Sequence, residues 1–202
     1  MRLAALLAAL ALTGCAGTAP RPPAPMAPPP IIAVDAWGGT TDVTPTPPQR
    51  ITHITLHHQG EIWREGTDPA AYLRRLQQWS RLTKRWADIP YHYVIATDGR
   101  IFAARPLTQP GDTNTEYDPQ GHALLMLVGN FEEQQPTAAQ LDSAVALAAW
   151  LAREHRLGTD AIASHKDYSN QTVCPGRHLT AYLASGWFRA EVDQRLNAAT
   201  TR

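Results

Sequence analysis

From residue 51 to residue 198 the hydrophobic pattern alternates between strand-like runs and segments with helical spacing. Short runs rich in β-branched residues predict strands, and longer segments with apolar residues three and four positions apart predict core-facing helices. Such an alternation favours an α/β fold with a mixed central sheet flanked by helices. The predicted order is strand 51–57, helix 69–86, strands 91–96, 101–105 and 123–128, helix 138–156, strand 161–164, a loop, and helix 187–198.

Local capping and turn signals support several of these elements. Asp68-Pro69 provides an N-cap followed by proline at the first helical position, and Thr137 with Gln140 matches a capping box. Asp98-Gly99 between two apolar runs indicates a hairpin. Gly158 is expected to end the helix that begins near residue 138.

The N-terminus has the layout of an export signal. An apolar run from Leu3 to Leu12 follows Met1-Arg2 and is too short to span a bilayer. The run ends in Leu12-Thr13-Gly14-Cys15, which resembles the lipobox of bacterial lipoproteins. We therefore expect a signal peptide over 1–14 and lipidation of Cys15; the alternative is a plain secretory signal with an incidental cysteine. In that family, the alanine that follows Cys15 implies an outer-membrane anchor facing the periplasm.

The segment from Cys15 to residue 49 is dense in proline and alanine. Such a composition favours extended polyproline segments without a core, so we expect a tether over 15–49. The apolar residues 31–37 within it could add an edge strand or make a surface contact, and their pattern does not decide between the two. A folded domain over 50–197 and a tail over 198–202 complete the expected organisation.

Charge content argues against one class of function, and cysteine content argues against a disulfide. The chain has 18 lysines and arginines and 18 aspartates and glutamates, so it lacks the basic field that nucleic-acid binding requires. The chain has two cysteines, and if Cys15 carries lipid then Cys174 has no partner for a disulfide within the chain. Cys174 is therefore available for other chemistry.

Three residues of zinc-ligand type stand at strand ends or in loops: His57, His165 and Cys174. Two imidazoles and a thiolate leave one tetrahedral position open for water, which is the arrangement of catalytic zinc sites. Because the chain has eight histidines, this spacing alone does not separate a zinc site from three unrelated residues.

Several short motifs occur in an order that resembles one known family. They are Leu56-His57-His58, Trp86-Ala87-Asp88-Ile89-Pro90-Tyr91-His92-Tyr93, Asp98-Gly99, Val128-Gly129-Asn130-Phe131 and the stretch from His165 to Cys174-Pro175-Gly176. Together they resemble the type-2 N-acetylmuramoyl-L-alanine amidases and peptidoglycan recognition proteins over residues 50 to 185. We expect the corresponding fold.

The resemblance implies a zinc hydrolase that cuts the amide bond between N-acetylmuramic acid and L-alanine of peptidoglycan. It places the zinc ligands at His57, His165 and Cys174 and the catalytic residues at Tyr91 and Thr172. Zinc lowers the pKa of its bound water from about 15.7 to about 7 and polarises the scissile carbonyl. Tyr91 would orient the water or the tetrahedral oxygen, and Thr172 would donate a hydrogen bond to the developing oxyanion. We expect a monomer that binds peptidoglycan or muropeptides.

Other polar residues near the motifs have simpler explanations. His58 and His92 point to the opposite strand face from their catalytic neighbours and are expected to pack rather than bind metal. His53 is expected to be structural, with a contact to the ligand histidine as the alternative. Asp167 could orient His165 or cap the loop, and His178 could touch substrate or have no role.

Two positions depart from the family pattern. The segment Gly111-Asp112-Thr113-Asn114-Thr115 stands where relatives often have a histidine that touches the sugar or peptide, which leaves the glycan contacts open. Ser164 stands where many relatives have glycine, and this change could shift the loop that carries the second histidine ligand.

Two rival functions follow from the same motifs. One is a peptidoglycan-binding lipoprotein without turnover, but Cys174 and Tyr91 argue against it, since relatives that only bind usually lack the cysteine. The other is a zinc peptidase that cuts within the stem peptide, which only the family resemblance excludes.

Overall fold

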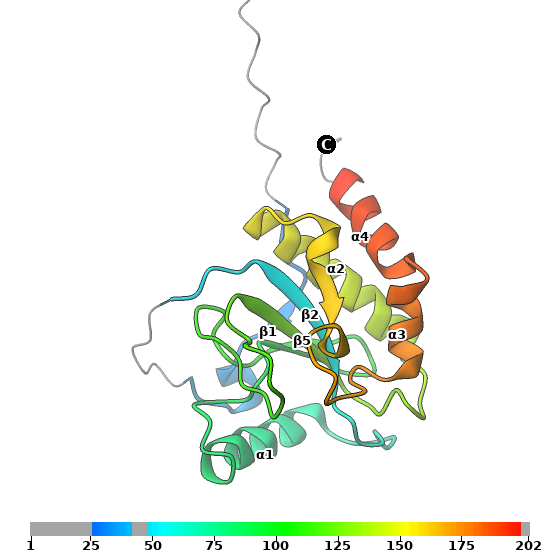
Figure 1. The fold of residues 1–202 in the computed structure, drawn as a ribbon. Coiled ribbons are helices and arrows are strands. Elements are labelled where there is room, and N and C mark those ends of the chain that lie inside the picture. The colour runs from blue at the N-terminus through cyan, green and yellow to red at the C-terminus, as the bar shows by residue number, and fades with distance from the viewer. Residues whose placement is uncertain (1–25, 42–47, 199–202) are drawn as a thin grey trace, which may run out of the picture.

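The computed structural model describes residues 26–41 and 48–198, which form a six-stranded sheet with helices on both faces (Figure 1). The strand order is β1-β4-β3-β5-β2-β6. Strands β3 and β4 pair antiparallel, and all other neighbouring strands pair in parallel, so the predicted mixed sheet is confirmed. The strands are β1 (Ile31–Ile32), β2 (His53–His58), β3 (Tyr93–Ile95), β4 (Ile101–Ala103), β5 (His122–Leu127) and β6 (Ile162–Ser164).

The helices divide between the two faces of the sheet. Helix α1 covers one face, and α2, α3 and α4 lie on the other (Figure 1). None of the helices within 26–41 and 48–198 is long and apolar enough to cross a membrane. The helices are α1 (Pro69–Leu82), α2 (Ala138–His155), α3 (Arg177–Ala184) and α4 (Trp187–Ala198), with short 3-10 turns at Asp35–Trp37, Thr159–Ala161 and His165–Asp167.

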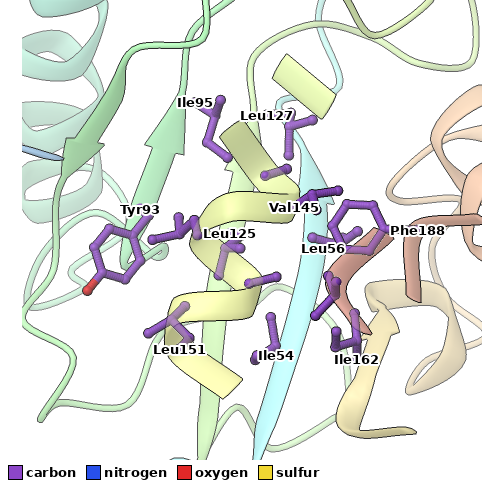
Figure 2. Packing of buried hydrophobic residues seen from close by; sticks show 14 of the residues in the cluster. Ile54, Leu56, Tyr93, Ile95, Leu125, Leu127, Val145, Leu151, Ile162 and Phe188 are labelled. Carbon is purple, nitrogen blue, oxygen red and sulfur yellow. The ribbon is translucent and has the colours of Figure 1, made fainter. Parts of the chain in front are cut away.

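Strand β5 runs through the middle of the core and is buried on both faces. Leu125 and Leu127 pack toward Val145 of α2 (Figure 2), whereas Met126 faces the cluster that contains Leu73 of α1. Successive side chains of a strand point to opposite faces. A strand covered on both sides therefore needs the continuous apolar run that the sequence shows, rather than alternation.

The predicted start of α1 is confirmed, but its predicted end is wrong. The Asp68 carboxylate accepts hydrogen bonds from the backbone N–H groups of Ala70 and Ala71, as expected of an N-cap. The helix ends at Leu82 instead of residue 86, and Arg85 adopts a left-handed conformation with φ of 59°. Trp86 falls at the helical spacing but lies beyond the end of the helix. Its ring packs edge-on against that of Trp79, with 5.9 Å between the ring centroids.

Helix α2 has the predicted capping box, in which Thr137 accepts from the Gln140 N–H and the Gln140 side chain accepts from the Thr137 N–H. It ends at His155, just before Arg156 adopts a left-handed conformation, so Gly158 is not the residue that stops it.

The loop predicted between His165 and residue 187 is only partly correct, because α3 lies within it. This helix has eight residues, and only Leu179 and Leu183 are buried. Two buried positions are too few to produce a recognisable helical period, because a periodic pattern needs a window of about 11 to 18 residues.

Residues 26–41, which the composition assigned to the tether, pack on the domain. Strand β1 pairs in parallel with β4, which answers the open question about residues 31–37. The Trp37 side chain is buried, and its indole N–H donates to the carbonyl of Ala103 at 2.7 Å. A two-residue strand after a run of prolines carries no period, so the contact was not predictable from the pattern. Cys15, the expected signal peptide and residues 199–202 lie outside the described residues.

If residues 26–41 are part of the fold, replacing Trp37 should destabilise the whole domain. Trp37 is 2% exposed, so we expect Trp37→Ala to lower the free energy of unfolding by about 3 to 5 kcal/mol. Leu82→Ala is the control, since Leu82 is 65% exposed and its loss should change stability by less than about 0.5 kcal/mol. Urea denaturation measures both; equal stability of Trp37→Ala and the unaltered protein would contradict the packing described here.

Candidate active site

Three potential metal ligands come together at one edge of the sheet. His57 lies near the C-terminal end of β2, and His165 follows β6, which pairs in parallel with β2. Cys174 comes from the loop that precedes α3. One ligand atom from each residue lies within 4.8 Å of the other two. Parallel pairing is what brings the first two together, because it aligns the carboxyl ends of both strands.

The loop that carries Cys174 lies against the segment that follows β5, and Gly176 is its point of closest approach. Gly176 has a φ of 86°, and a Cβ atom there would lie 2.4 Å from the carbonyl carbon of Phe131. The N–H of His178 then donates to the carbonyl of Phe131 at 3.0 Å. Only glycine combines this backbone conformation with this close approach, which explains the glycine after Cys174-Pro175.

The geometry of the three donors fits a zinc ion. Ligands about 2.1 Å (nitrogen) and about 2.3 Å (sulfur) from a tetrahedral zinc ion are about 3.6 Å apart. His57 Nδ1 and Cys174 Sγ are 3.6 Å apart. The rings of His57 and His165 have centroids 4.7 Å apart. Two imidazoles and one sulfur also form a donor set that zinc prefers, and three protein ligands leave a position open.

Burial keeps the two imidazoles in the form that binds metal. Burial, with a smaller effect of the His165 ring, lowers the pKa of His57 well below its usual value. Burial also lowers the pKa of His165 to about 4. Both rings are therefore neutral near pH 7 and keep a lone pair available for a cation.

Burial has the opposite effect on the thiol. It raises the pKa of Cys174 to about 12, against a smaller lowering by the N–H of His58, which donates to the sulfur at 3.4 Å. Without a nearby cation the sulfur would stay protonated, whereas coordination to zinc deprotonates a thiol outright. The His58 N–H is positioned to stabilise the resulting thiolate.

An open cleft of about 400 Å³ leads to the three donors. Tyr91 and Thr172, the two catalytic residues that the family resemblance implies, both line it. The ring of Tyr91 lies 5.1 Å from that of His57, centroid to centroid. The Thr172 hydroxyl oxygen accepts from the N–H of Cys174 at 3.0 Å, which leaves its own hydrogen unused in that bond. The structure thus brings all five predicted site residues to one cleft.

His58 and His92 are not among the three donors, as predicted, although His58 lines the same cleft. His58 Nδ1 accepts from the N–H of Phe131 at 3.2 Å. His92 Nδ1 accepts from the N–H of Leu124 at 2.9 Å, and its Nε2 lies 2.8 Å from the carbonyl of Gln109. Both rings therefore tie neighbouring segments together.

The structure also separates the alternatives for the other polar residues. His53 stacks on His122 with 4.6 Å between ring centroids and serves packing. The Asp167 carboxylate accepts from the Ser164 N–H at 2.8 Å and from its hydroxyl at 2.6 Å, so it caps the loop and does not orient His165. This bond uses the serine that replaces the family's glycine. His178 Nδ1 lies 2.8 Å from the side chain of Gln135.

One contact at the site was not predictable from the sequence. The hydroxyl of Thr115 lies 2.8 Å from His165 Nε2. Thr115 sits in a segment without periodicity, and no sequence signal connects it to a histidine fifty positions later.

A second cleft of about 440 Å³ continues from the first and shares five of its lining residues, Gln59, Trp86, Pro90, Tyr91 and Asn114. Its other walls include the aromatic side chains of Tyr72 and Trp79 and the charged side chains of Glu61 and Arg75. The two clefts together form a groove along α1 with the three donors at one end.

Comparison with known proteins agrees with this geometry. Residues 47–177 match the amidase-2 family, described as N-acetylmuramoyl-L-alanine amidase. The chain is 26% identical to peptidoglycan-recognition protein SD of Drosophila simulans over 160 residues, 76% of this chain and 84% of that protein.

Solved structures show the same fold. The endolysin N-acetylmuramoyl-L-alanine amidase LysCS from Clostridium intestinale superimposes with a TM-score of 0.61 at 26% identity, covering 79% of this chain and 96% of the other. Peptidoglycan recognition protein-LE in complex with tracheal cytotoxin, a monomeric diaminopimelic acid-type peptidoglycan, superimposes with a TM-score of 0.68 at 22% identity, covering 77% and 92%. The chain therefore belongs to the amidase-2 family of N-acetylmuramoyl-L-alanine amidases and peptidoglycan recognition proteins.

Proposed function

We propose that this protein is a zinc-dependent N-acetylmuramoyl-L-alanine amidase, which hydrolyses the amide bond between N-acetylmuramic acid and L-alanine of the peptidoglycan stem peptide. The observation that carries the proposal is the His57, His165 and Cys174 donor set at the base of an open cleft. Structural zinc sites are closed by four protein ligands, whereas three ligands beside a cleft are typical of catalytic sites.

A zinc ion bound by these residues would supply a Lewis acid and a water of lowered pKa. Tyr91 lies on the cleft wall beside His57, where its hydroxyl can orient the water or the oxygen of the scissile carbonyl. Burial and the neighbouring Cys174 raise the pKa of Tyr91 well above its usual value, so its hydroxyl stays protonated and can donate. Thr172 can donate its unused hydroxyl hydrogen to the oxygen that gains negative charge.

The groove fits an elongated substrate that has both sugar and peptide parts. Trp79 and Trp86 offer aromatic surface in the second cleft, and Arg75 offers a positive charge for a carboxylate. The muropeptide-bound relative supports a ligand of this class. The equal numbers of acidic and basic residues do not favour nucleic acid.

A peptidoglycan-binding protein without turnover is the main rival, because the chain also resembles recognition proteins. The buried thiol among the donors favours the amidase, since a site that only binds a glycan and peptide needs no metal ligands. A peptidase that cuts inside the stem peptide would use the same metal chemistry, and only reaction products separate the two.

We further propose that a lipid on Cys15 anchors the protein to the outer membrane, with the domain in the periplasm as a monomer. Support comes from the Leu12-Thr13-Gly14-Cys15 motif after the apolar run and from the absence of aspartate after the cysteine. Several acyl chains on one residue hold a protein at a bilayer stably, whereas one chain binds reversibly.

The amidase reaction predicts defined products from purified peptidoglycan. Digestion should release free stem peptides that begin at L-alanine, and mass spectrometry identifies them. Their release should stop when a chelator removes the metal, and Cys174→Ala should be inactive, because the site then lacks one of its three ligands. His178→Ala is the control and should retain activity, since His178 contacts Gln135 outside the cleft. Peptides that begin at a later residue would identify a peptidase, and undigested peptidoglycan that retains the protein would identify a binding protein.

Thr172 should act on turnover more than on substrate binding. We expect Thr172→Ala to lower kcat by about 100-fold or more, the typical effect of removing one oxyanion donor. Thr172→Ser keeps the hydroxyl and should retain most of the activity. Because Thr172 also accepts from the Cys174 N–H, zinc content must be measured for both variants. Full zinc content with unchanged kcat in Thr172→Ala would remove Thr172 from the reaction.

Lipidation predicts the mass of the mature protein. In a bacterial host, the mature N-terminus should be an acylated Cys15 and the protein should fractionate with membranes. Cys15→Ala should lack the acyl mass and leave the membrane fraction. A mature protein with an unmodified N-terminus beyond Cys15 would instead indicate a plain secretory signal.

A further inference from the structure

The segment 110–115 follows the hairpin of β3 and β4 in the chain, and it contacts one of the three donors directly. Thr115 Oγ1 lies 2.8 Å from Nε2 of His165. A ring nitrogen that shares a hydrogen bond with a hydroxyl cannot also bind a metal, so Nδ1 is the nitrogen of His165 left for zinc. A neutral imidazole that binds through Nδ1 carries its proton on Nε2. In this state the Nε2–H donates and the Thr115 hydroxyl accepts.

We propose that Thr115 is a positioning residue that holds His165 in the ring orientation and tautomer needed to bind zinc, and this role rests on the proposed function. The two imidazoles differ in this respect. His57 Nε2 is buried without a hydrogen-bond partner in the described part of the chain, whereas His165 Nε2 has Thr115. Outer hydrogen-bond partners of metal-bound histidines set the tautomer and raise metal affinity.

A second hydroxyl, that of Thr113, is compatible with this direction of the Thr115 hydrogen bond. Thr113 Oγ1 lies 2.8 Å from Thr115 Oγ1 and also accepts the backbone N–H of Thr115 at 3.1 Å. Thr115 can therefore pass its own hydroxyl hydrogen to Thr113 and keep a lone pair for His165. Thr113 lines the cleft, so this chain of hydrogen bonds connects the ligand histidine with the substrate groove.

Contacts of Arg105 and Gly111 hold the segment against the rest of the domain. Arg105 is 5% exposed; its guanidinium pairs with the Asp112 carboxylate and donates to the carbonyls of Pro110 at 2.5 Å and Ile89 at 2.9 Å. Gly111 lies against the backbone of Pro90, and a Cβ atom at Gly111 would be 2.5 Å from the Pro90 carbonyl oxygen. These contacts explain the Gly-Asp-x-x-Thr sequence of a segment that departs from the family pattern.

The proposal is tested by the zinc affinity of the purified full-length protein, measured by competition with a chelating dye. Thr115→Val keeps the shape of the side chain but removes the hydroxyl, and we expect it to weaken zinc binding by about 10- to 100-fold. Thr115→Ser restores the acceptor and should bind zinc within a few-fold of the unaltered protein. Thr108→Val is the matched control, because Thr108 is exposed and lies outside both clefts.

The outcomes separate this proposal from the proposed function. Equal zinc affinity in Thr115→Val and the unaltered protein would overturn the role of Thr115 while leaving the metal site intact. Equal weakening in Thr115→Ser and Thr115→Val would also overturn it, because the hydroxyl would then not be the cause. No zinc binding by the unaltered protein would overturn the proposed function itself. Unfolding of the zinc-free variants should match that of the zinc-free unaltered protein, which separates ligand positioning from loss of structure.

Discussion

Parallel pairing of β2 with β6 is the constraint on which the rest of the site depends. It aligns the carboxyl ends of two strands that are distant in sequence, so that His57 and His165 meet at one edge of the sheet. The third donor, Cys174, reaches this edge because Gly176 lets its loop lie against Phe131. The flanking helices matter to function mainly by burying both faces of β5, which keeps the strands in register.

Burial of the three donors determines what the site can bind. His57 and Cys174 are 3% and 7% exposed, and this burial favours neutral imidazoles and a protonated thiol. A buried thiolate is costly without a compensating charge. A divalent cation held by His57, His165 and Cys174 would supply that charge and leave the sulfur deprotonated, so burial and metal binding would favour the same arrangement. The groove beside these donors leaves them open to a substrate.

Much of this fold could be predicted from the sequence because its main elements carry local signals. The caps at Asp68 and Thr137 mark helix starts, and the β-branched run before His57 marks the strand that carries the first ligand. Strand β1, helix α3 and the contact of Thr115 with His165 could not be predicted, because each depends on tertiary packing and not on a local period. The donor set itself required the family resemblance, since three residues among eight histidines and two cysteines are not distinctive by spacing.

Isotope labelling tests most directly whether this chain hydrolyses the amide bond between N-acetylmuramic acid and L-alanine. The zinc-loaded protein is incubated with a purified muropeptide in water enriched in oxygen-18, and the products are fragmented in a mass spectrometer. Amidase chemistry predicts one labelled oxygen in the lactyl carboxylate of the muramic acid and a free amino group on L-alanine. Label in a carboxylate of the stem peptide, or no labelled product, would show that the protein is not this amidase.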